Sequence, residues 1–330
     1  MTSGRIWRTA TVRRKAELAG RKVGQRDIHG WLAVDKPEAM TSADVVAVAK
    51  RTLKARKVGH AGTLDRPATG VLALAFGEAT KTIPHVMDSL KIYKFLVRFG
   101  QATTTDDATG DVVAESEQRP AREDILNALH RFRGNIKQRP PDYSAVKVSG
   151  RRASSIAASG EAVELAPRSL RVDRLELVRF VDNLHAEFEL HCGKGGYVRS
   201  IARDLGEVLG CLAHVRALRR LATGPFRIEN CSTLAQINNL GPDAEPERFL
   251  LPLEFGLSSF AELKCTEIEA ARIRNGMTCR FDPLPNDRSS PRVVWVSCSG
   301  RAVATGELKD GLFQPRRVFR VETVAGGHAE

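Results

Sequence analysis

The sequence predicts an α+β fold followed by a second, small β-rich domain. As far as about residue 225, segments with helical apolar spacing alternate with segments in which every second residue is apolar. Residues 241–247 are rich in glycine, proline and acids, and beyond them the pattern changes to short strands separated by turns. A chain of 330 residues is long enough to bury two cores.

Composition divides the chain into four parts. Residues 1–27 are expected to form a basic flexible arm, because residues 1–26 hold eight Lys or Arg, one acid and few large apolar groups. Such a start is also typical of a mitochondrial transit peptide, but apolar residues are too sparse here for an amphipathic face. We expect the main domain over residues 28–250, the small domain over 251–325 and a disordered tail at 326–330.

The charge balance indicates a polyanionic partner. The net charge of +12 and the pI of about 9.7 favour nucleic acid, since lysine and arginine release counterions when they neutralise phosphates. An incidentally basic protein is the alternative. No apolar run is long enough to span a bilayer, so no membrane partner is expected. The six cysteines form no C-x-x-C pair, which argues against a zinc site or disulfide framework and favours a reducing cytoplasm.

The first elements follow from apolar periodicity. Residues 31–34 are predicted to form a strand, and residues 42–54 a helix that Thr41 or Ser42 caps. Residues 71–76 are an unbroken apolar run, which predicts a buried strand.

A strand with one apolar face is predicted at residues 91–99. Its aromatic and aliphatic residues recur at every second position: Tyr93, Phe95, Val97 and Phe99. The later elements are expected in this order: a helix at 121–133, strands at 171–180 and 184–191, a helix at 201–209, a helix at 268–275, and strands at 293–296, 302–304 and 318–321.

One glycine-rich loop, between the helix at 42–54 and the strand at 71–76, holds a single carboxylate. It runs Gly59-His60-Ala61-Gly62-Thr63-Leu64-Asp65-Arg66-Pro67-Ala68-Thr69-Gly70. Its glycines allow unusual backbone angles, and the residue before Pro67 is disfavoured in helical space. A turn cap is the ordinary role for an aspartate here, but loops on rigid scaffolds also display reactive groups, so both roles are open for Asp65.

Two further features suggest contacts with phosphates or acids. Residues 131–152 hold seven Lys or Arg against one acid, with Tyr143 among them, a composition that suits an RNA backbone with an unstacked base. A solvated basic loop is the alternative. Arg199 is expected at a helix start, where the helix dipole disfavours a cation. That position predicts a partner carboxylate or phosphate, with an unpartnered exposed arginine as the alternative.

Five segments in order resemble the TruB family of tRNA pseudouridine-55 synthases, in its bacterial stand-alone form. They are Asp35-Lys36-Pro37-Glu38-Ala39-Met40-Thr41-Ser42, Gly59-His60-Ala61-Gly62-Thr63-Leu64-Asp65, Lys91-Ile92-Tyr93, Pro140-Pro141-Asp142-Tyr143-Ser144-Ala145, and Lys194-Gly195-Gly196-Tyr197-Val198-Arg199-Ser200 with Asp204-Leu205-Gly206. The resemblance covers roughly residues 28–225, and five ordered motifs are far more specific than one.

The resemblance implies a fold and an activity. The fold is a mixed, largely antiparallel central sheet flanked by helices, the pseudouridine synthase fold, with a small C-terminal PUA-like domain that binds RNA. The activity is isomerisation of uridine 55 in the T-loop of tRNA by base flipping and an aspartate-dependent exchange of a C–N for a C–C glycosidic bond. It implies no metal and no cofactor, and a cytoplasmic monomer whose partner is the T-loop and stem of tRNA.

The resemblance also assigns roles to residues. Asp65 matches the catalytic aspartate, and Arg199 the arginine paired with it. Tyr93 matches the tyrosine that stacks on the target uracil and to which a proton-transfer role is assigned. His60 matches the residue that fills the space left by the flipped base, while Tyr197 and Leu218 would line the pocket. Further contacts to RNA are expected from Lys36, Tyr143, Lys147, Arg151, Arg219 and Arg220.

Four departures and two rival functions accompany the resemblance. Arg66 and Pro67 follow Asp65 where the family usually has proline and leucine, and Ala39, Thr104 and Ser154 replace a usual glycine, aspartate and tyrosine. One rival function is that of a guide-RNA-dependent relative. The sequence Gly62-Thr63-Leu64-Asp65 and the long segment after residue 132 favour the stand-alone form instead. The other is that of a tRNA-binding folding helper without catalysis, although Asp65, Tyr93 and Arg199 are all retained.

Overall fold

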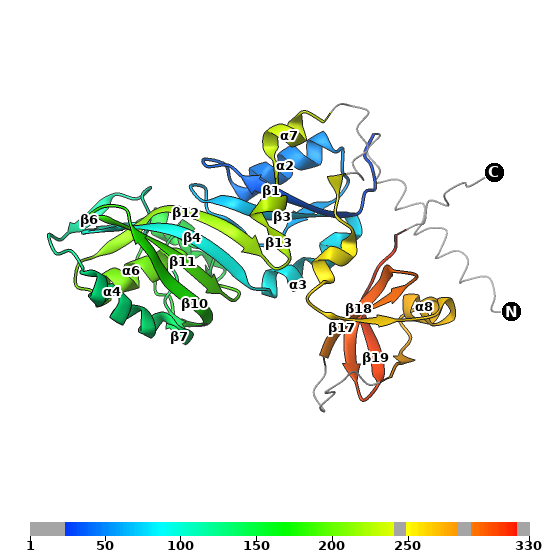
Figure 1. The fold of residues 1–330 in the computed structure, drawn as a ribbon. Coiled ribbons are helices and arrows are strands. Elements are labelled where there is room, and N and C mark those ends of the chain that lie inside the picture. The colour runs from blue at the N-terminus through cyan, green and yellow to red at the C-terminus, as the bar shows by residue number, and fades with distance from the viewer. Residues whose placement is uncertain (1–23, 241–248, 283–291, 322–330) are drawn as a thin grey trace.

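The computed structural model of the protein describes residues 24–240, 249–282 and 292–321 (Figure 1). Most of the expected arm at 1–27, the compositional break at 241–247 and the tail at 326–330 lie outside the described residues. Within them, the chain forms one large sheet with its helices, one small C-terminal sheet and two two-stranded sheets, β5 (Gln101–Thr103) with β6 (Val112–Glu115) and β8 (Lys147–Val148) with β9 (Arg151–Arg152).

The large sheet is mixed and largely antiparallel, as predicted. Its path through the described residues is β14 (Ser232–Thr233), β1 (Gly30–Lys36), β3 (Thr69–Phe76), β12 (Ala213–Thr223), β4 (Lys91–Phe99), β11 (His185–Cys192), β10 (Arg168–Phe180) and β7 (Gly134–Gln138). Two short strands join its sides, β2 (Val58–His60) on β3 and β13 (Phe226–Arg227) on β12. Only β1–β14 and β3–β12 of these pairs are parallel.

Helices flank this sheet. Those of the main domain are α2 (Ser42–Thr52), α3 (Ile83–Asp88), α4 (Arg122–Leu129), α5 (Ala153–Ala158), α6 (Val198–Val208) and α7 (Leu234–Asn238). The start of α2 is set by a capping box, in which the Thr41 hydroxyl accepts from the Asp44 backbone N–H and the Asp44 carboxylate accepts from that of Thr41. Such a cap contributes about 1 kcal/mol to stability.

Strand β3 is buried on both faces because two different cores cover it. Leu72, Leu74 and Phe76 pack towards α2 and α7. Val71 and Ala73, on the opposite face, join a cluster that includes Trp31 of β1 and Trp295 of the small domain. This double burial explains why the strand is an unbroken apolar run instead of an alternating one.

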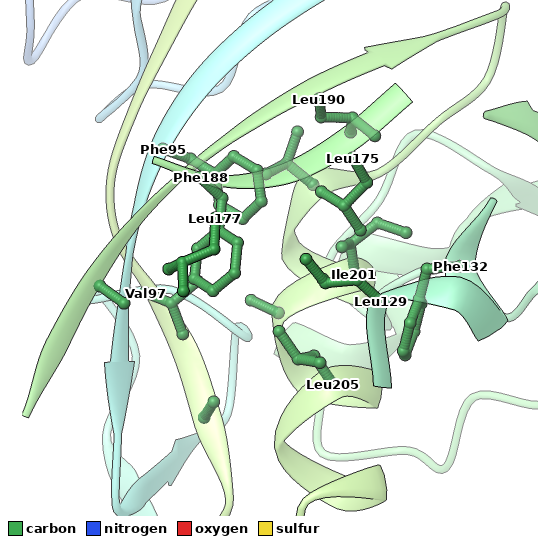
Figure 2. Packing of buried hydrophobic residues seen from close by; sticks show 14 of the residues in the cluster. Phe95, Val97, Leu129, Phe132, Leu175, Leu177, Phe188, Leu190, Ile201 and Leu205 are labelled. Atoms are coloured by element: carbon green, nitrogen blue, oxygen red, sulfur yellow. The ribbon is translucent and has the colours of Figure 1, made fainter. Parts of the chain in front are cut away.

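A further core lies between the antiparallel half of the sheet and the helices α4 and α6 (Figure 2). Phe95 of β4 stacks on Phe188 of β11 with ring centroids 5.5 Å apart. Ile201 and Leu205 of α6 are fully buried in the same cluster. Because Tyr93 belongs to this cluster too, the predicted alternation of β4 is confirmed, and the packing of α6 fixes the helix against β4.

The small sheet has the order β15 (Ala261–Lys264), β17 (Arg292–Cys298), β18 (Arg301–Lys309), β19 (Leu312–Val318) and β16 (Cys279–Arg280), with α8 (Glu267–Arg274) beside it. The predicted strand at 318–321 is wrong. The last strand, β19, ends where that prediction begins, and it was missed because Gln314, Pro315 and Arg316 obscure its alternation. Phe319, just after it, packs into the cluster that contains Trp31.

Gly70 of β3 lies tightly against the backbone of Arg220 in β12. Its φ is +100°, and a Cβ there would lie 2.2 Å from the Arg220 carbonyl oxygen. Gly150, in the turn between β8 (Lys147–Val148) and β9 (Arg151–Arg152), also has a positive φ, +85°, but has open space around it.

We therefore expect Gly70→Ala to lower the free energy of unfolding by on the order of 3 kcal/mol, from strain and overlap together. The matched variant Gly150→Ala should cost about 1 kcal/mol, from strain alone. Urea unfolding of both variants measures the difference. Equal losses would show that the contact between the strands at Gly70 is not tight.

Candidate active site

The glycine-rich loop is anchored at both ends, so that Asp65 is held in place and remains exposed. The Ala61 N–H donates to the Ala73 carbonyl, which continues the β2–β3 pairing into the loop. The buried Ser42 hydroxyl accepts from the Leu64 N–H at 2.9 Å and donates to the Leu64 carbonyl at 3.1 Å. The Asp65 side chain, next in the chain, is 43% exposed.

Lys36 is fully buried under this loop and does not face solvent. Its Nζ donates to the carbonyls of Pro37 at 2.9 Å, Met40 at 2.6 Å and Arg66 at 3.1 Å. Burial lowers the pKa of the Lys36 ammonium. Three carbonyls inside the protein use the donors of Lys36, so in this structure the side chain supports the loop, and its contact with RNA stays a prediction.

Two of the departures from the family pattern contact each other. Arg66 Nε donates to the Ala39 carbonyl at 2.9 Å. Ala39 has a left-handed backbone, φ 65°, which is the conformation that favours glycine. The Arg66 side chain thus ties the residue after Asp65 to the same turn that Lys36 binds.

Arg220 is the second buried cation. Its Nε donates to the Val71 carbonyl at 2.7 Å and its Nη2 to the Gly62 carbonyl at 3.0 Å. The side chain points under the loop because Arg220 pairs with Gly70 on one side and with Tyr93 on the other. Arg220 is 1% exposed, so it too supports the loop from inside, and its contact with RNA stays a prediction.

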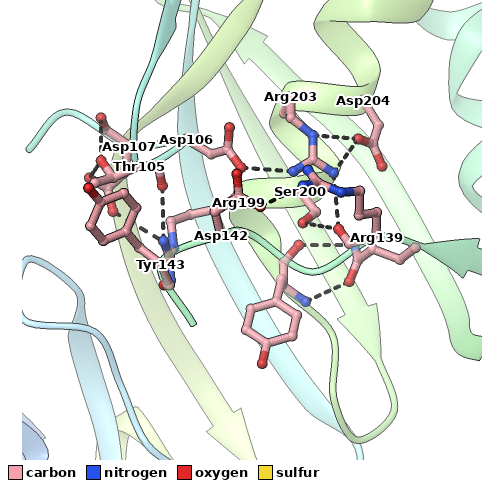
Figure 3. Close-up of polar contacts among 12 residues, drawn as sticks. Thr105, Asp106, Asp107, Arg139, Asp142, Tyr143, Arg199, Ser200, Arg203 and Asp204 are labelled. Carbon is pink, nitrogen blue, oxygen red and sulfur yellow. Dashed lines mark hydrogen bonds and ion pairs between the residues drawn. The ribbon is translucent and has the colours of Figure 1, made fainter. Parts of the chain in front are cut away.

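Arg199 binds Asp65 directly. Helix α6 begins at Val198, three residues before the predicted start, so Arg199 lies in its first turn. Its Nε is 2.9 Å from a carboxylate oxygen of Asp65, and the arginine side chain is 6% exposed. Nη1 donates to the Thr105 carbonyl at 2.9 Å and Nη2 to the Tyr143 carbonyl at 3.0 Å, which Figure 3 shows. A guanidinium held at three points gives Asp65 a rigid partner.

Asp107 is a site residue that the sequence analysis did not single out. Its Oδ2 is 3.7 Å from Arg199 Nε, and the residue is buried. Its Oδ1 accepts from the hydroxyls of Thr105 at 2.7 Å and Thr109 at 2.5 Å, and from the Thr109 N–H at 2.9 Å. The run of threonines around two adjacent aspartates is the pattern that could have indicated it. Thr104 helps to close this turn, because its hydroxyl accepts from the Asp111 N–H.

Tyr93 and Leu218 lie close to Arg220 on the paired strands β4 and β12. Tyr93 is buried on β4, opposite Arg220 of β12, and burial raises the pKa of its hydroxyl. Arg220 and Asp65 are both near enough to act on that pKa electrostatically. Leu218 is partly buried two residues before Arg220, opposite Phe95. One aromatic ring and one aliphatic side chain therefore lie on the paired strands β4 and β12, close to Arg220.

Tyr197 and His60 are half-buried at the edges of this arrangement. Tyr197 precedes α6, and its backbone exchanges two hydrogen bonds with the Gln138 side chain. His60 is on β2, and its Nδ1 is buried with no hydrogen-bond partner among the described residues. Burial lowers the pKa of its imidazole.

The remaining cations expected to contact RNA are on the surface. Lys147 is exposed on β8. Arg151 on β9 pairs with Glu161 at 2.8 Å. Arg219 forms two hydrogen bonds to the Asp35 carboxylate, at 3.1 and 2.7 Å. Tyr143 is half-buried, and its carbonyl accepts from Arg199.

The geometry therefore joins an exposed carboxylate, a fixed guanidinium and a tyrosine. An exposed carboxylate of this kind can act as a nucleophile or as a general base. No cluster of His, Cys, Asp and Glu suited to a metal ion occurs in residues 24–240, 249–282 and 292–321. Within the same ranges, no helix is both long and apolar enough to cross a membrane.

Known proteins resemble the chain over most of its length. The profile of the TruB family pseudouridylate synthase N-terminal domain matches residues 50–198, and that of the tRNA pseudouridylate synthase B C-terminal domain matches residues 199–258. A tRNA pseudouridine synthase B of a Ruegeria species is 52% identical over 91% of this chain and 99% of that protein. The protein of the same name from Bradyrhizobium diazoefficiens is 46% identical over 90% of this chain and 87% of its own length.

Solved structures share the fold at lower identity. A chain in an H/ACA RNP bound to a substrate RNA containing 2'-deoxyuridine aligns with a TM-score of 0.68 and 22% identity, over 88% of this chain and 85% of that chain. A chain in a Cbf5-Nop10-Gar1 complex gives the same TM-score and coverage at 24% identity. These similarities show the pseudouridine synthase fold alone, whereas the identity to the sequence relatives shows the family: the chain belongs to the TruB family of pseudouridylate synthases.

Proposed function

We propose that this protein isomerises uridine 55 in the T-loop of tRNA to pseudouridine. The observation that carries the proposal is the partly exposed Asp65 carboxylate, 2.9 Å from the buried Arg199 guanidinium. This arrangement occurs in a chain about half identical to proteins named tRNA pseudouridine synthase B.

The reaction needs the target base outside the helical stack, since the glycosidic bond is otherwise covered. The N1–C1′ bond then breaks, the uracil turns and C5 bonds to C1′, while the proton on C5 leaves and N1 gains one. Asp65 attacks or deprotonates the nucleotide to start this exchange. Arg199 aims the carboxylate, since its buried guanidinium holds one carboxylate oxygen at 2.9 Å.

The other residues divide into three groups. Tyr93 stacks on the uracil, with Leu218 and Tyr197 lining the pocket and His60 filling the space that the base leaves. Tyr143, Lys147, Arg151 and Arg219 contact the RNA, as does the small C-terminal domain. Lys36 and Arg220 hold the loop of Asp65 from inside the protein, because their donors end on its carbonyls.

The two rival functions fit the molecule less well. A folding helper needs no carboxylate held by a buried arginine, yet that pair is assembled here. The relatives named tRNA pseudouridine synthase B are 46–52% identical to this chain, which favours a tRNA substrate over a guide-RNA-dependent function.

We further propose a cytoplasmic monomer. One chain supplies Asp65, Arg199 and Tyr93, and all six cysteines are free thiols, as a reducing compartment favours. The division into domains at residues 28–250 and 251–325 stays a prediction.

Asp65→Asn tests the proposed catalytic residue. Asparagine keeps the size and most hydrogen bonds but removes the charge, so pseudouridine formation in single turnover should fall below detection. The affinity for tRNA should stay within roughly tenfold, or about 1.4 kcal/mol. The control is Asp173→Asn, an exposed aspartate paired with Arg171, which should react like wild type. Near-normal turnover by folded Asp65→Asn would reduce Asp65 to a turn cap.

Tyr93→Phe separates the hydroxyl from the ring. We expect the single-turnover rate to fall by about 100-fold, because proton transfer is lost while stacking remains. Tyr93→Leu should also weaken tRNA binding, by about 1–3 kcal/mol. If Tyr93→Phe reacts at the wild-type rate, the residue serves packing alone.

Lys147→Gln tests the exposed hairpin. Removing one phosphate contact should reduce the slope of log K against log salt by about 0.7–0.9, without altering the rate at saturating tRNA. Binding measured at several salt concentrations gives the slope. An unchanged slope would place Lys147 outside the RNA interface.

A further inference from the structure

Helix α6 carries two arginines on one face, and both reach the same turn. Arg199 and Arg203 are four residues apart, a spacing that puts side chains one above the other. Arg199 binds the Thr105 carbonyl at 2.9 Å and lies 3.7 Å from the Asp107 carboxylate. Arg203 binds the residue between these two, with its Nη1 2.9 Å from Asp106 Oδ2 (Figure 3).

The backbone conformation of Asp106 directs the carboxylates of Asp106 and Asp107 to different arginines. Its φ is 58°, a left-handed conformation that is uncommon outside glycine and is tolerated best by Asn and Asp. The carboxylate of Asp106 ends on Arg203, whereas that of its neighbour Asp107 ends near Arg199. The turn is also held from below, because the Asp106 carbonyl accepts from the Val215 N–H of β12 at 3.1 Å.

Arg203 also reaches the second loop that holds Arg199. Its Nη2 donates to the Arg139 carbonyl at 3.0 Å, and the buried Ser200 hydroxyl donates to the same oxygen at 2.7 Å. Four residues further along that loop, the Tyr143 carbonyl accepts from Arg199 Nη2. Every segment that orients the Arg199 guanidinium by a carbonyl is thus bound by Arg203 as well.

We infer that Asp106 and Arg203 are positioning residues for the proposed reaction: their ion pair sets the turn at Thr105–Asp107 so that Arg199 is aimed at Asp65. Neither residue contacts Asp65 in a recorded hydrogen bond or ion pair among the described residues, so the effect passes through Arg199. The catalytic consequence rests on the proposed function, whereas the effect on Arg199 does not.

The ion pair between Asp106 and Arg203 matters more for the geometry of the site than for the stability of the fold. Both side chains are 16% exposed and line a cavity of about 310 Å³, together with Thr104, Arg139, Asp142 and Glu207. When the Asp106 carboxylate is removed, Arg203 keeps the Asp204 carboxylate at 2.7 Å and the Arg139 carbonyl at 3.0 Å, and water can enter the cavity. Variants at Asp106 should therefore fold.

Asp106→Gly tests the inference, since glycine adopts the left-handed backbone without strain and removes only the carboxylate. The single-turnover rate should fall about tenfold while tRNA affinity stays within about twofold, because a displaced Arg199 misaligns Asp65. Asp106→Asn, which keeps an acceptor in the same backbone, should retain the rate within about threefold. The control Glu176→Gln breaks an exposed 2.6 Å pair with Arg174 and should leave the rate unchanged.

The second readout does not require tRNA. The Arg199 Nε–H, assigned in the NMR spectrum by its loss in Arg199→Lys, should exchange with solvent faster in Asp106→Gly and in Arg203→Met than in wild type. The double variant should lose less than the two single losses added together, because both changes remove the Asp106–Arg203 pair, although Arg203→Met also removes the bond to the Arg139 carbonyl.

Unchanged Nε–H exchange in both variants would overturn the inference, and so would additive losses of rate. If wild type formed no pseudouridine at position 55, the proposed function would fail. The exchange measurement would still decide whether Asp106 and Arg203 position Arg199.

Discussion

The ion pair between Asp65 and Arg199 is the contact on which the site depends, because a buried guanidinium needs a partner for each of its donors. Arg199 satisfies this need with a carboxylate from the loop after β2, a carbonyl from the turn after β5 (Gln101–Thr103) and a carbonyl from the loop after β7. Three segments that are distant in sequence therefore converge on one side chain. The packing of Ile201 and Leu205 of α6 against β4 holds that side chain in place.

Much of the positive charge near the site is used inside the protein. Lys36 and Arg220 donate to carbonyls on either side of Asp65, at Arg66 and at Gly62, and so shape the loop from below. Other cations, such as Lys147, are exposed on the surface. A net charge of +12 thus includes both buried cations that support the loop and exposed cations, which composition alone does not separate.

Departures from the family pattern also acquire a local explanation. Arg66 donates to the carbonyl of Ala39, which holds the left-handed turn where glycine is usual in the family. Thr104 accepts from the Asp111 N–H and thereby closes the turn that carries Asp107. Arg66 and Thr104 thus each form a hydrogen bond that supports the backbone around the site.

Local patterns in the sequence determined the strands β3 and β4, the helix α2 with its cap at Thr41, and Asp65 as the single acid of a shaped loop. Each of these follows from neighbours a few residues away, through apolar spacing, capping and backbone preference. Only the tertiary structure decided that Lys36 and Arg220 are buried, that Asp107 joins Arg199 and that α6 begins at Val198. Those outcomes depend on hydrogen-bond partners from distant segments, and no local pattern identifies such partners.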